Sequence, residues 1–381
     1  MDFDFTDDQA SLRDAVARWV EKGFSFERRH GIAKAGGATR AVYAELAELG
    51  LTGLAVPEAF GGMANSTQWG AVEAMVVMEE LGRGLVNAPY AAGALVAPTL
   101  LAAAPAGVQA AWLPKIASAE ALVVLAHQER GARYRLHHVT TRATATAGGH
   151  VLTGTKSLVP AGDEADAFIV PARLSGADDD STGIGLFLVE RSASGATLRG
   201  YPTQDGARAA ELTLAATPAT LITDDGAALL EQAVDVGIAA VCAEAVGLMD
   251  RLVAITVEYM NTRKQFGATL ASFQALRHRM ADVKMNLELA RSMSYFASMK
   301  LGEPAPQRRR ALSQAKLQLG HSMRYVGQQC IQLHGGIGVT DEYIASHYFK
   351  RLTVMEMSFG DTLHHLGEVS ARMQGTAGVF A

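Results

Sequence analysis

A basic cluster interrupts a long apolar helical pattern in the C-terminal part of the sequence. It reads Arg263-Lys264-Gln265-Phe266-Gly267, and Gln274 follows eleven residues after Arg263. An arginine beside a glycine turn suits two-pronged binding of a phosphate group. The same residues are also typical of a helix C-terminus, where basic side chains and a following glycine are common. The spacing alone favours neither interpretation.

Two further polar clusters lie downstream. Residues 332–338 begin with Gln332 and contain Gly335, Gly336 and Gly338, which would each cost about 1 kcal/mol inside a helix. These glycines either end the helix or let the backbone approach a flat or charged ligand. Residues 358–361 precede the last predicted helix, where Asp361 can serve as an N-cap.

Several well-known site patterns are absent from the sequence, namely a phosphate-binding loop, a dinucleotide glycine motif, a nucleophile elbow and a zinc HExxH motif. The histidine pairs 137–138 and 364–365 are adjacent in the chain, and adjacent residues do not share a helix face. We therefore expect no metal site. Cys242 and Cys330 fall on apolar helical positions and are predicted to be buried free thiols in a reducing compartment.

Composition excludes several classes of protein. The 381 residues are 49% hydrophobic and 19% charged, which argues against disorder, and the net charge is −5. The longest basic run, residues 308–310, is too short to indicate a nucleic-acid groove. Residues 91–108 carry no charge but contain Pro98 and Pro105, so we expect a helix pair and no membrane span. With no secretory signal expected, the predicted location is cytoplasmic.

The hydrophobic pattern divides the chain into three predicted domains: helices over 1–118, strands over 119–220 and long helices over 221–381. In the last part, apolar residues recur every 3.5 positions, as in antiparallel helices that supercoil into a bundle. The predicted fold class is α+β and mainly α, with an antiparallel β-barrel or sandwich between an N-terminal helical domain and a C-terminal four-helix bundle. The expected strands cover 122–126, 143–147, 151–156, 168–171, 185–190 and 211–214, with a hairpin turn at Gly148-Gly149.

Taken together, these features resemble the acyl-CoA dehydrogenase family over nearly the whole chain. Matching segments occur in the family's order at 5–9, 50–57, 61–62, 79–83, 263–267 with Gln274, and 332–336. Residues 354–361, followed by His364-His365, are similar to the small-subunit branch of pimeloyl-CoA dehydrogenase. The resemblance implies fatty acid metabolism, an acyl-CoA substrate, FAD, an electron-transfer flavoprotein as acceptor, and a homo- or hetero-oligomer, with a tetramer expected.

The resemblance also implies which residues bind FAD. Arg263 and Phe266 would meet its pyrophosphate and ring side, and Gln274 would lie along the same site. A second group, Gln332, Gly335 and Gly336, would reach the FAD of a neighbouring subunit.

In the strand domain the family contacts the cofactor near the positions of Gln128 and Glu129. Leu158 and Pro160 depart from the family, which usually carries tryptophan and threonine there. The departure removes an aromatic wall and a hydroxyl donor from the expected flavin pocket.

The expected catalytic base is missing. The family's usual glutamate position is occupied by Phe359, and its alternative position by Gly237. Asp361 is the preferred substitute, while Asp235 and Glu356 are weaker candidates. A carboxylate misplaced by an ångström can cost ~10²-fold in rate.

Three functions therefore stay open. The first is FAD-dependent dehydrogenation of an acyl-CoA thioester to the 2,3-enoyl-CoA, alone or as a subunit of a heteromeric enzyme. The second is a non-catalytic partner subunit that lacks its own base. The third is a flavin monooxygenase on the same scaffold, which also tolerates loss of the base.

Overall fold

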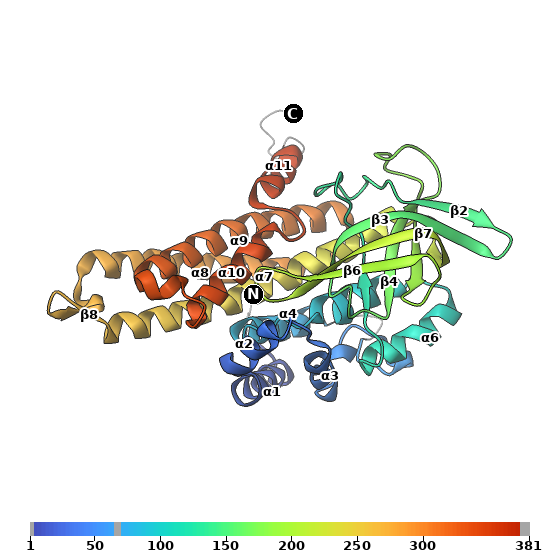
Figure 1. Cartoon of the computed structure of the whole chain (residues 1–381). Coiled ribbons are helices and arrows are strands. Elements are labelled where there is room, and N and C mark those ends of the chain that lie inside the picture. Colours follow the sequence, from blue (N-terminus) through green and yellow to red (C-terminus); the bar gives the residue numbers. More distant parts are fainter. Residues whose placement is uncertain (1–3, 65–69, 374–381) are drawn as a thin grey trace. The chain divides into compact units, whose positions relative to one another are not determined.

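The computed structural model describes residues 4–64 and 70–373, and these form two compact units. Of the described residues, one unit comprises 4–30, 71–86 and 238–373, and the other comprises 31–64, 70 and 87–237. Figure 1 shows the course of the chain. Each unit is described separately below.

Long helices make up the first unit. They are α1 (Asp7–Gly23), the start of α2 (Phe26–Lys34), α4 (Ala71–Arg83), most of α7 (Ala227–Thr262), α8 (Gln274–Lys300), α9 (Ala305–His334), α10 (Ile344–Met357) and α11 (Thr362–Met373). Helices α8, α10 and α11 pack against α9, while α4 packs against α1 and α8. The C-terminal part therefore holds five helices in its described residues, and α10 was not foreseen by the predicted four-helix bundle.

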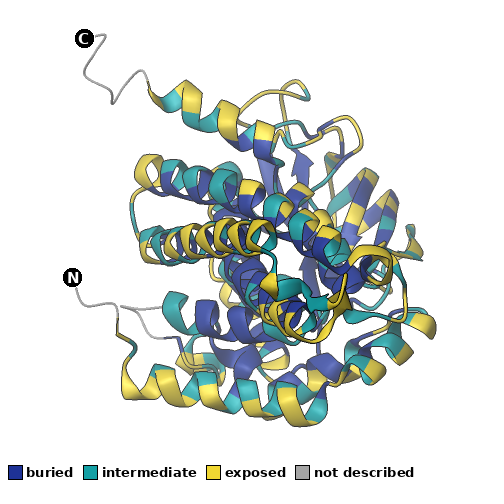
Figure 2. Cartoon of the chain, turned by 90° about the vertical axis from the view of Figure 1, so that its left-hand side faces the viewer, coloured by how far each residue is buried: buried dark blue, intermediate teal, exposed yellow. Residues whose placement is uncertain are grey.

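Sequence signals explain how these helices begin and pack. Thr6 caps α1 in a capping box with Gln9. The apolar residues spaced 3.5 apart are buried along α7 and α9, and Figure 2 shows helices with buried and exposed faces. Helices α4 and α7 approach closely at Gly82 and Gly247, because a Cβ at either glycine would collide with the opposing backbone. Cys242 and Cys330 are buried free thiols, as predicted.

The second unit contains a β-barrel. Its strands are β1 (Val123–Leu125), β2 (Arg142–Thr146), β3 (Gly149–Pro160), β4 (Ala167–Arg173), β5 (Ile184–Glu190), β6 (Ala196–Pro202) and β7 (Arg208–Thr223). The order β4-β2-β3-β7-β5 closes because β5 pairs with β4, so the sheet is a five-stranded barrel and not a sandwich. Strands β1 and β6 pair with β4 and β7 outside this ring.

Two details of the strand prediction are wrong. The barrel is mainly but not purely antiparallel, since β4 pairs in parallel with β1 and with β2. The β2–β3 hairpin turns at Ala147-Gly148, one residue earlier than predicted, and Gly149 opens β3 opposite Thr146. Strand β6 was also missed, and none of its residues is fully buried.

Short elements complete the second unit. Helices α3 (Arg40–Glu48), η1 (Leu51–Gly53), η2 (Glu58–Phe60), the π-helix η3 (Ala91–Val96), α5 (Ala97–Leu101) and α6 (Ala106–Ala117) precede the barrel. The uncharged stretch 91–108 thus forms η3, α5 and the start of α6. Across the described ranges, no helix combines the length and the hydropathy needed to cross a membrane. Trp69, where a helix was expected to begin, lies outside the described residues.

Candidate functional site

The basic cluster forms a tight turn between α7 and α8. Helix α7 ends at Thr262, and the two-residue strands β8 (Lys264–Gln265) and β9 (Ala268–Thr269) enclose Phe266 and Gly267. Both turn residues have positive φ, 53° and 77°, as in hairpin turns of the primed types. A phenylalanine rarely adopts this conformation, so the backbone holds Phe266 in a strained position.

The side chains of this turn face solvent. The ring of Phe266 is 93% exposed and meets Phe273 edge-on at 6.4 Å between centroids. Arg263 and Gln274 are also exposed. Within the described part of the chain, the guanidinium of Arg263 has no hydrogen-bond or ion-pair partner, whereas its amide donates to Tyr259 O at 2.8 Å. The turn therefore ends α7 and also presents to solvent an arginine and an aromatic ring whose one ring contact among the described residues is Phe273.

The glycine cluster follows the end of α9 in the short helix η5 (Gly335–Val339). Gly335 has φ 65° and ψ −141°, a conformation reserved for glycine, and so it ends the helix as one interpretation predicted. A Cβ at Gly335 or Gly336 would meet no atom within 4 Å, so packing within the chain does not require glycine there. Gln332 and both glycines are exposed, which leaves open backbone at this position.

An aromatic contact joins these two clusters. The ring of Tyr259, one turn before Arg263, lies 4.7 Å from the ring of His334, which directly precedes Gly335. The His334 Nδ1–H donates to Cys330 O at 2.8 Å, and burial lowers the pKa of the imidazole. Tyr343 also packs against His334 at 5.1 Å, and its ring lies 6.4 Å from that of Tyr259. A neutral, oriented histidine thus fixes the ends of α7 and α9 beside each other.

The strand-domain positions depend on a buried ion pair. Lys156 Nζ lies 2.6 Å from Glu129 Oε1, and both side chains are almost fully buried. The Glu129 carboxylate also accepts hydrogen bonds from the backbone N–H and hydroxyl groups of Thr140 and Thr141. Burial raises the pKa of Glu129, but the ammonium and these donors outweigh it and lower the value to about 2.

This ion pair lies beside two predicted cofactor positions. The Gln128 carbonyl accepts the Ser157 N–H at 2.8 Å, which ties residue 128 to β3. A register shift between Lys156 and Val159 then turns Leu158 outward, with φ 52° and 56% of its surface exposed. The strand domain therefore presents Leu158 on an irregular stretch of β3 that follows the buried Lys156–Glu129 ion pair.

Models of all three acyl-CoA dehydrogenase domains match the chain in order: the N-terminal domain over 6–120, the middle domain over 125–216 and the C-terminal domain over 224–374. Acyl-CoA dehydrogenase IpdE2 of Mycobacterium tuberculosis is 31% identical over 348 residues, which cover 91% of each chain. The chain belongs to the acyl-CoA dehydrogenase family. This confirms the resemblance at the level of the family.

Solved structures of other proteins share the fold. Glutaryl-coenzyme A dehydrogenase in its glutaryl-CoA complex superposes with a TM-score of 0.91 at 21% identity, covering 100% of this chain and 98% of that one. A chain of the ChsE4-ChsE5 complex from Mycobacterium tuberculosis gives 0.87 at 24% identity, covering 99% and 100%. Both likenesses concern the architecture alone.

The turn that carries the family's usual glutamate position lies between α10 and α11. Phe359 there has φ 56° and is followed by Gly360 with φ 115°. Asp361 Oδ1 accepts the His364 N–H at 2.8 Å, so its carboxylate caps α11. The buried Glu356 carboxylate accepts the backbone N–H of Thr362 at 3.0 Å and also its hydroxyl. Both candidate acids near Phe359 thus have structural partners.

The remaining acid candidate lies elsewhere. Asp235 is fully buried in the first part of α7, two residues before Gly237. Its burial places the carboxylate in the interior of its unit and not at an exposed turn. The three acids named from the sequence therefore occupy three different environments.

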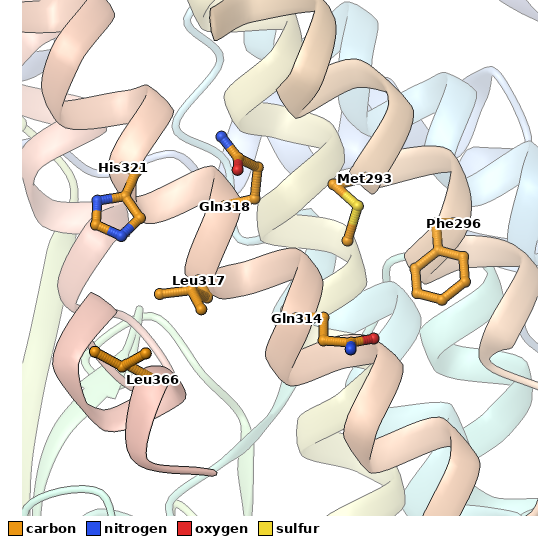
Figure 3. Close-up of a pocket in the computed structure, with 7 residues that line it drawn as sticks. All are labelled: Met293, Phe296, Gln314, Leu317, Gln318, His321 and Leu366. Carbon is orange, nitrogen blue, oxygen red and sulfur yellow. The ribbon is translucent and has the colours of Figure 1, made fainter. Parts of the chain in front are cut away.

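Sequence reasoning missed two features of the helical unit. One is Lys316, a fully buried lysine in α9. The other is a surface pocket of about 480 Å³ between α8, α9 and α11 (Figure 3). It is lined by Met293, Phe296, Gln314, Leu317, Gln318, His321 and Leu366, none of which was a predicted site residue. Neither feature has a local motif, because each arises where separate helices meet.

Proposed function

We propose that this chain catalyses the FAD-dependent α,β-dehydrogenation of an acyl-CoA thioester to the 2,3-enoyl-CoA, in a homo- or hetero-oligomer. The observation that carries the proposal is the exposed turn with Arg263 and Phe266 beside the open backbone of Gly335 and Gly336. Membership of the acyl-CoA dehydrogenase family supports the reaction class.

The residues at this end of the helical unit fit a dinucleotide. The Arg263 guanidinium would bind a pyrophosphate, and the glycines leave room for a ligand to approach the main chain. Gln274 and Gln332 would add amide donors, and Gln128 would contribute from the strand domain. When bound, FAD supplies the acceptor for the substrate's β-hydride.

An oligomer is supported by the exposure of this half-site. Because Phe266 is 93% exposed and lies on a strained turn, its ring adds little to the stability of an isolated chain. Contact with a cofactor held by a second subunit would cover the ring of Phe266 and the open glycines. We propose a tetramer, with an electron-transfer flavoprotein as the acceptor of the electrons.

The substrate's α-proton requires a carboxylate base. Asp361 is the proposed acceptor in a self-sufficient enzyme, since it lies two residues from Phe359 in the same turn. The hydrogen bond from His364 N–H fixes the orientation of this carboxylate. The thioester itself would be held with its α-carbon facing this turn.

A second candidate function is that of a partner subunit without its own base. It is favoured by the side chain at position 359 and by the structural partners of Asp361 and Glu356. The likeness to a chain of the two-protein ChsE4-ChsE5 complex and to the pimeloyl-CoA dehydrogenase small-subunit branch is consistent with it. In that case another chain would supply the carboxylate.

The first test is the absorbance spectrum of the purified protein. We expect flavin absorbance, or its appearance after FAD is added, and bleaching by straight-chain, branched or dicarboxylic acyl-CoA thioesters without oxygen. Arg263→Ala should weaken FAD binding, whereas Arg277→Ala on the exposed part of α8 should not. A protein that stays colourless with added FAD contradicts the dehydrogenase, whereas a non-catalytic partner subunit need not bind FAD by itself.

The second test separates the two candidates. If the base is missing, Phe359→Glu should raise flavin reduction by roughly 10²- to 10⁴-fold, since the backbone at 359 is already preset. Phe359→Gln has nearly the same shape and should give no gain. Bleaching by the unaltered chain that Phe359→Glu does not improve would instead support a base elsewhere, with Asp361 first in line.

A further inference from the structure

Lys316 lies in the middle of α9 with no exposed surface. Its ammonium donates to Glu356 O at 2.8 Å and to Gly360 O at 2.9 Å. The first carbonyl belongs to the last turn of α10, where helix carbonyls have no partner within the helix. A positive charge is also favoured there by the helix dipole. The two carbonyls bracket residues 357–359, so one side chain spans the whole turn.

This turn has a backbone that needs support. Phe359 has φ 56° and Gly360 φ 115°, and a non-glycine residue persists in the left-handed region only where its surroundings impose it. His365 Nε2 lies 3.2 Å from Phe359 O, which adds one polar contact. A Cβ at Gly360 would lie within 3 Å of the rings of His364 and His365, so this position must be glycine.

Groups on α7, on α10 and in the turn itself act on the charge of Lys316. The Glu356 carboxylate, Asp361 and the Cys242 thiol offset the desolvation of the ammonium. Since Glu356 and Asp361 also bond to Thr362 and His364 at the start of α11, the ammonium and these acids act on the same turn from both sides. A neutral side chain at 316 would leave two buried carbonyls without donors.

We propose that Lys316 is a positioning residue whose ammonium sets the conformation of the turn at residues 357–361 and thereby the direction in which positions 359 and 361 present their side chains. Its consequence for catalysis rests on the proposed function, in which this turn faces the thioester. The positioning itself is a property of the helical unit alone.

The test compares Lys316→Met with Lys300→Met, which removes a half-exposed lysine from the end of α8. Hydrogen exchange is followed by mass spectrometry in the full-length protein. We expect exchange across 358–366 to rise by ~10-fold or more in Lys316→Met, while buried stretches of α7 stay within twofold. Lys300→Met should change neither region. Unchanged exchange across 358–366 in a folded Lys316→Met protein would overturn the proposal.

A second pair of variants covers the case in which Lys316→Met does not fold. Lys316→Gln keeps a donor group and Lys316→Arg keeps the charge, and both should show faster exchange in the turn than wild type, with Arg the milder. Chymotrypsin cleavage after Phe359 should rise from wild type to Lys316→Arg and again to Lys316→Gln. Equal cleavage in wild type and both variants would also overturn the proposal.

An active preparation adds a kinetic measurement. A misplaced turn should lower kcat by ~10-fold or more, with KM changed less than twofold, and Lys316→Arg should restore part of the loss. Faster exchange without any flavin reduction, even in wild type, would retain the positioning role and reject the proposed function. Flavin reduction with unchanged exchange would do the reverse.

Discussion

Two fully buried lysines hold two comparable pieces of backbone in different units. Lys156 pairs with the carboxylate of Glu129, whereas Lys316 donates to the carbonyls of Glu356 and Gly360. Each lies close to a non-glycine residue with left-handed backbone, Leu158 in one case and Phe359 in the other.

From the family resemblance, tryptophan and glutamate were expected at these two positions, where the chain carries Leu158 and Phe359. In each case the lysine donates hydrogen bonds to a buried acid or to backbone carbonyls and not to the side chain at the left-handed position. Geometry and chemistry are therefore separable in this fold, and the two lysines allow each to be tested.

The largest expected effect is at the ion pair. Lys156→Met leaves the buried Glu129 carboxylate without its cation, and we expect a loss of ~3 to 5 kcal/mol in the free energy of unfolding. Urea denaturation measures it. Lys284→Met, which breaks an exposed pair with Glu288, should cost less than about 1 kcal/mol.

The double variant sharpens this prediction. Replacing both partners, as Lys156→Met with Glu129→Gln, should recover much of the loss, because no unpaired charge stays buried. A double variant less stable than either single variant would show that the pair acts through some contact other than charge.

The contribution of Lys316 to the free energy of unfolding should change with pH in the alkaline range. Burial lowers the pKa of Lys316 to about 8 from 10.5, although Cys242, Glu356 and Asp361 raise it in part. Between these values the unfolded chain binds more protons than the folded one, so stability should rise with pH, by roughly 3 kcal/mol in total. The stability difference between wild type and Lys316→Met, measured from pH 7 to 11, isolates this effect.

The Glu129 carboxylate gives a pH dependence of the same sign in the acid range, where stability also rises with pH. Its pKa is lowered to about 2 from 4.5, so its contribution is present above pH 4.5 and is lost as pH falls toward 2. Glu129→Gln should remove that acid-side loss. Stability is measured against pH for wild type and Lys316→Met in the alkaline range, and for wild type and Glu129→Gln in the acid range. If the two curves run parallel in either range, the group replaced there does not titrate differently in the folded and unfolded chain, and the prediction for that group is wrong.

The sequence predicted the scaffold better than these supports. Apolar periodicity gave α7, α8 and α9, and alternating runs gave most barrel strands, because both signals are local. Helix α10 was missed because Lys350 and Arg351 interrupt its apolar pattern. Strand β6 was missed as well, and none of its residues is fully buried.

Only those site residues that belong to local sequence clusters could be predicted. The exposed residues Arg263, Phe266 and Gly335 lie in recognisable clusters, but no local pattern predicted that Tyr259 and His334 would bring the ends of α7 and α9 together. Lys316 follows Ala315 in an apolar helix, and a charged residue there suggests an exposed position. Its burial depends on carbonyls 40 and 44 residues away, which no local pattern encodes.

The smallest expected effect is at Asp361. Asp361→Ala removes the N-cap of α11 and should cost ~1 kcal/mol, whereas Asp361→Asn keeps a capping oxygen and should be nearly neutral in stability. Exchange across 358–366 should therefore rise in the first variant and not in the second.

Because Asp361→Asn preserves the turn that Lys316 holds, it tests chemistry without disturbing geometry. If Asp361 accepts the substrate's proton, this variant should bind FAD normally and lose acyl-CoA-dependent bleaching by ~10²-fold or more. If it keeps full bleaching, the carboxylate is only a cap, and the base must come from another residue or another chain. The turn that Lys316 supports would then resemble the strand that Lys156 supports, because neither would present a side chain that accepts the substrate's proton. The two would differ only in their place in the fold.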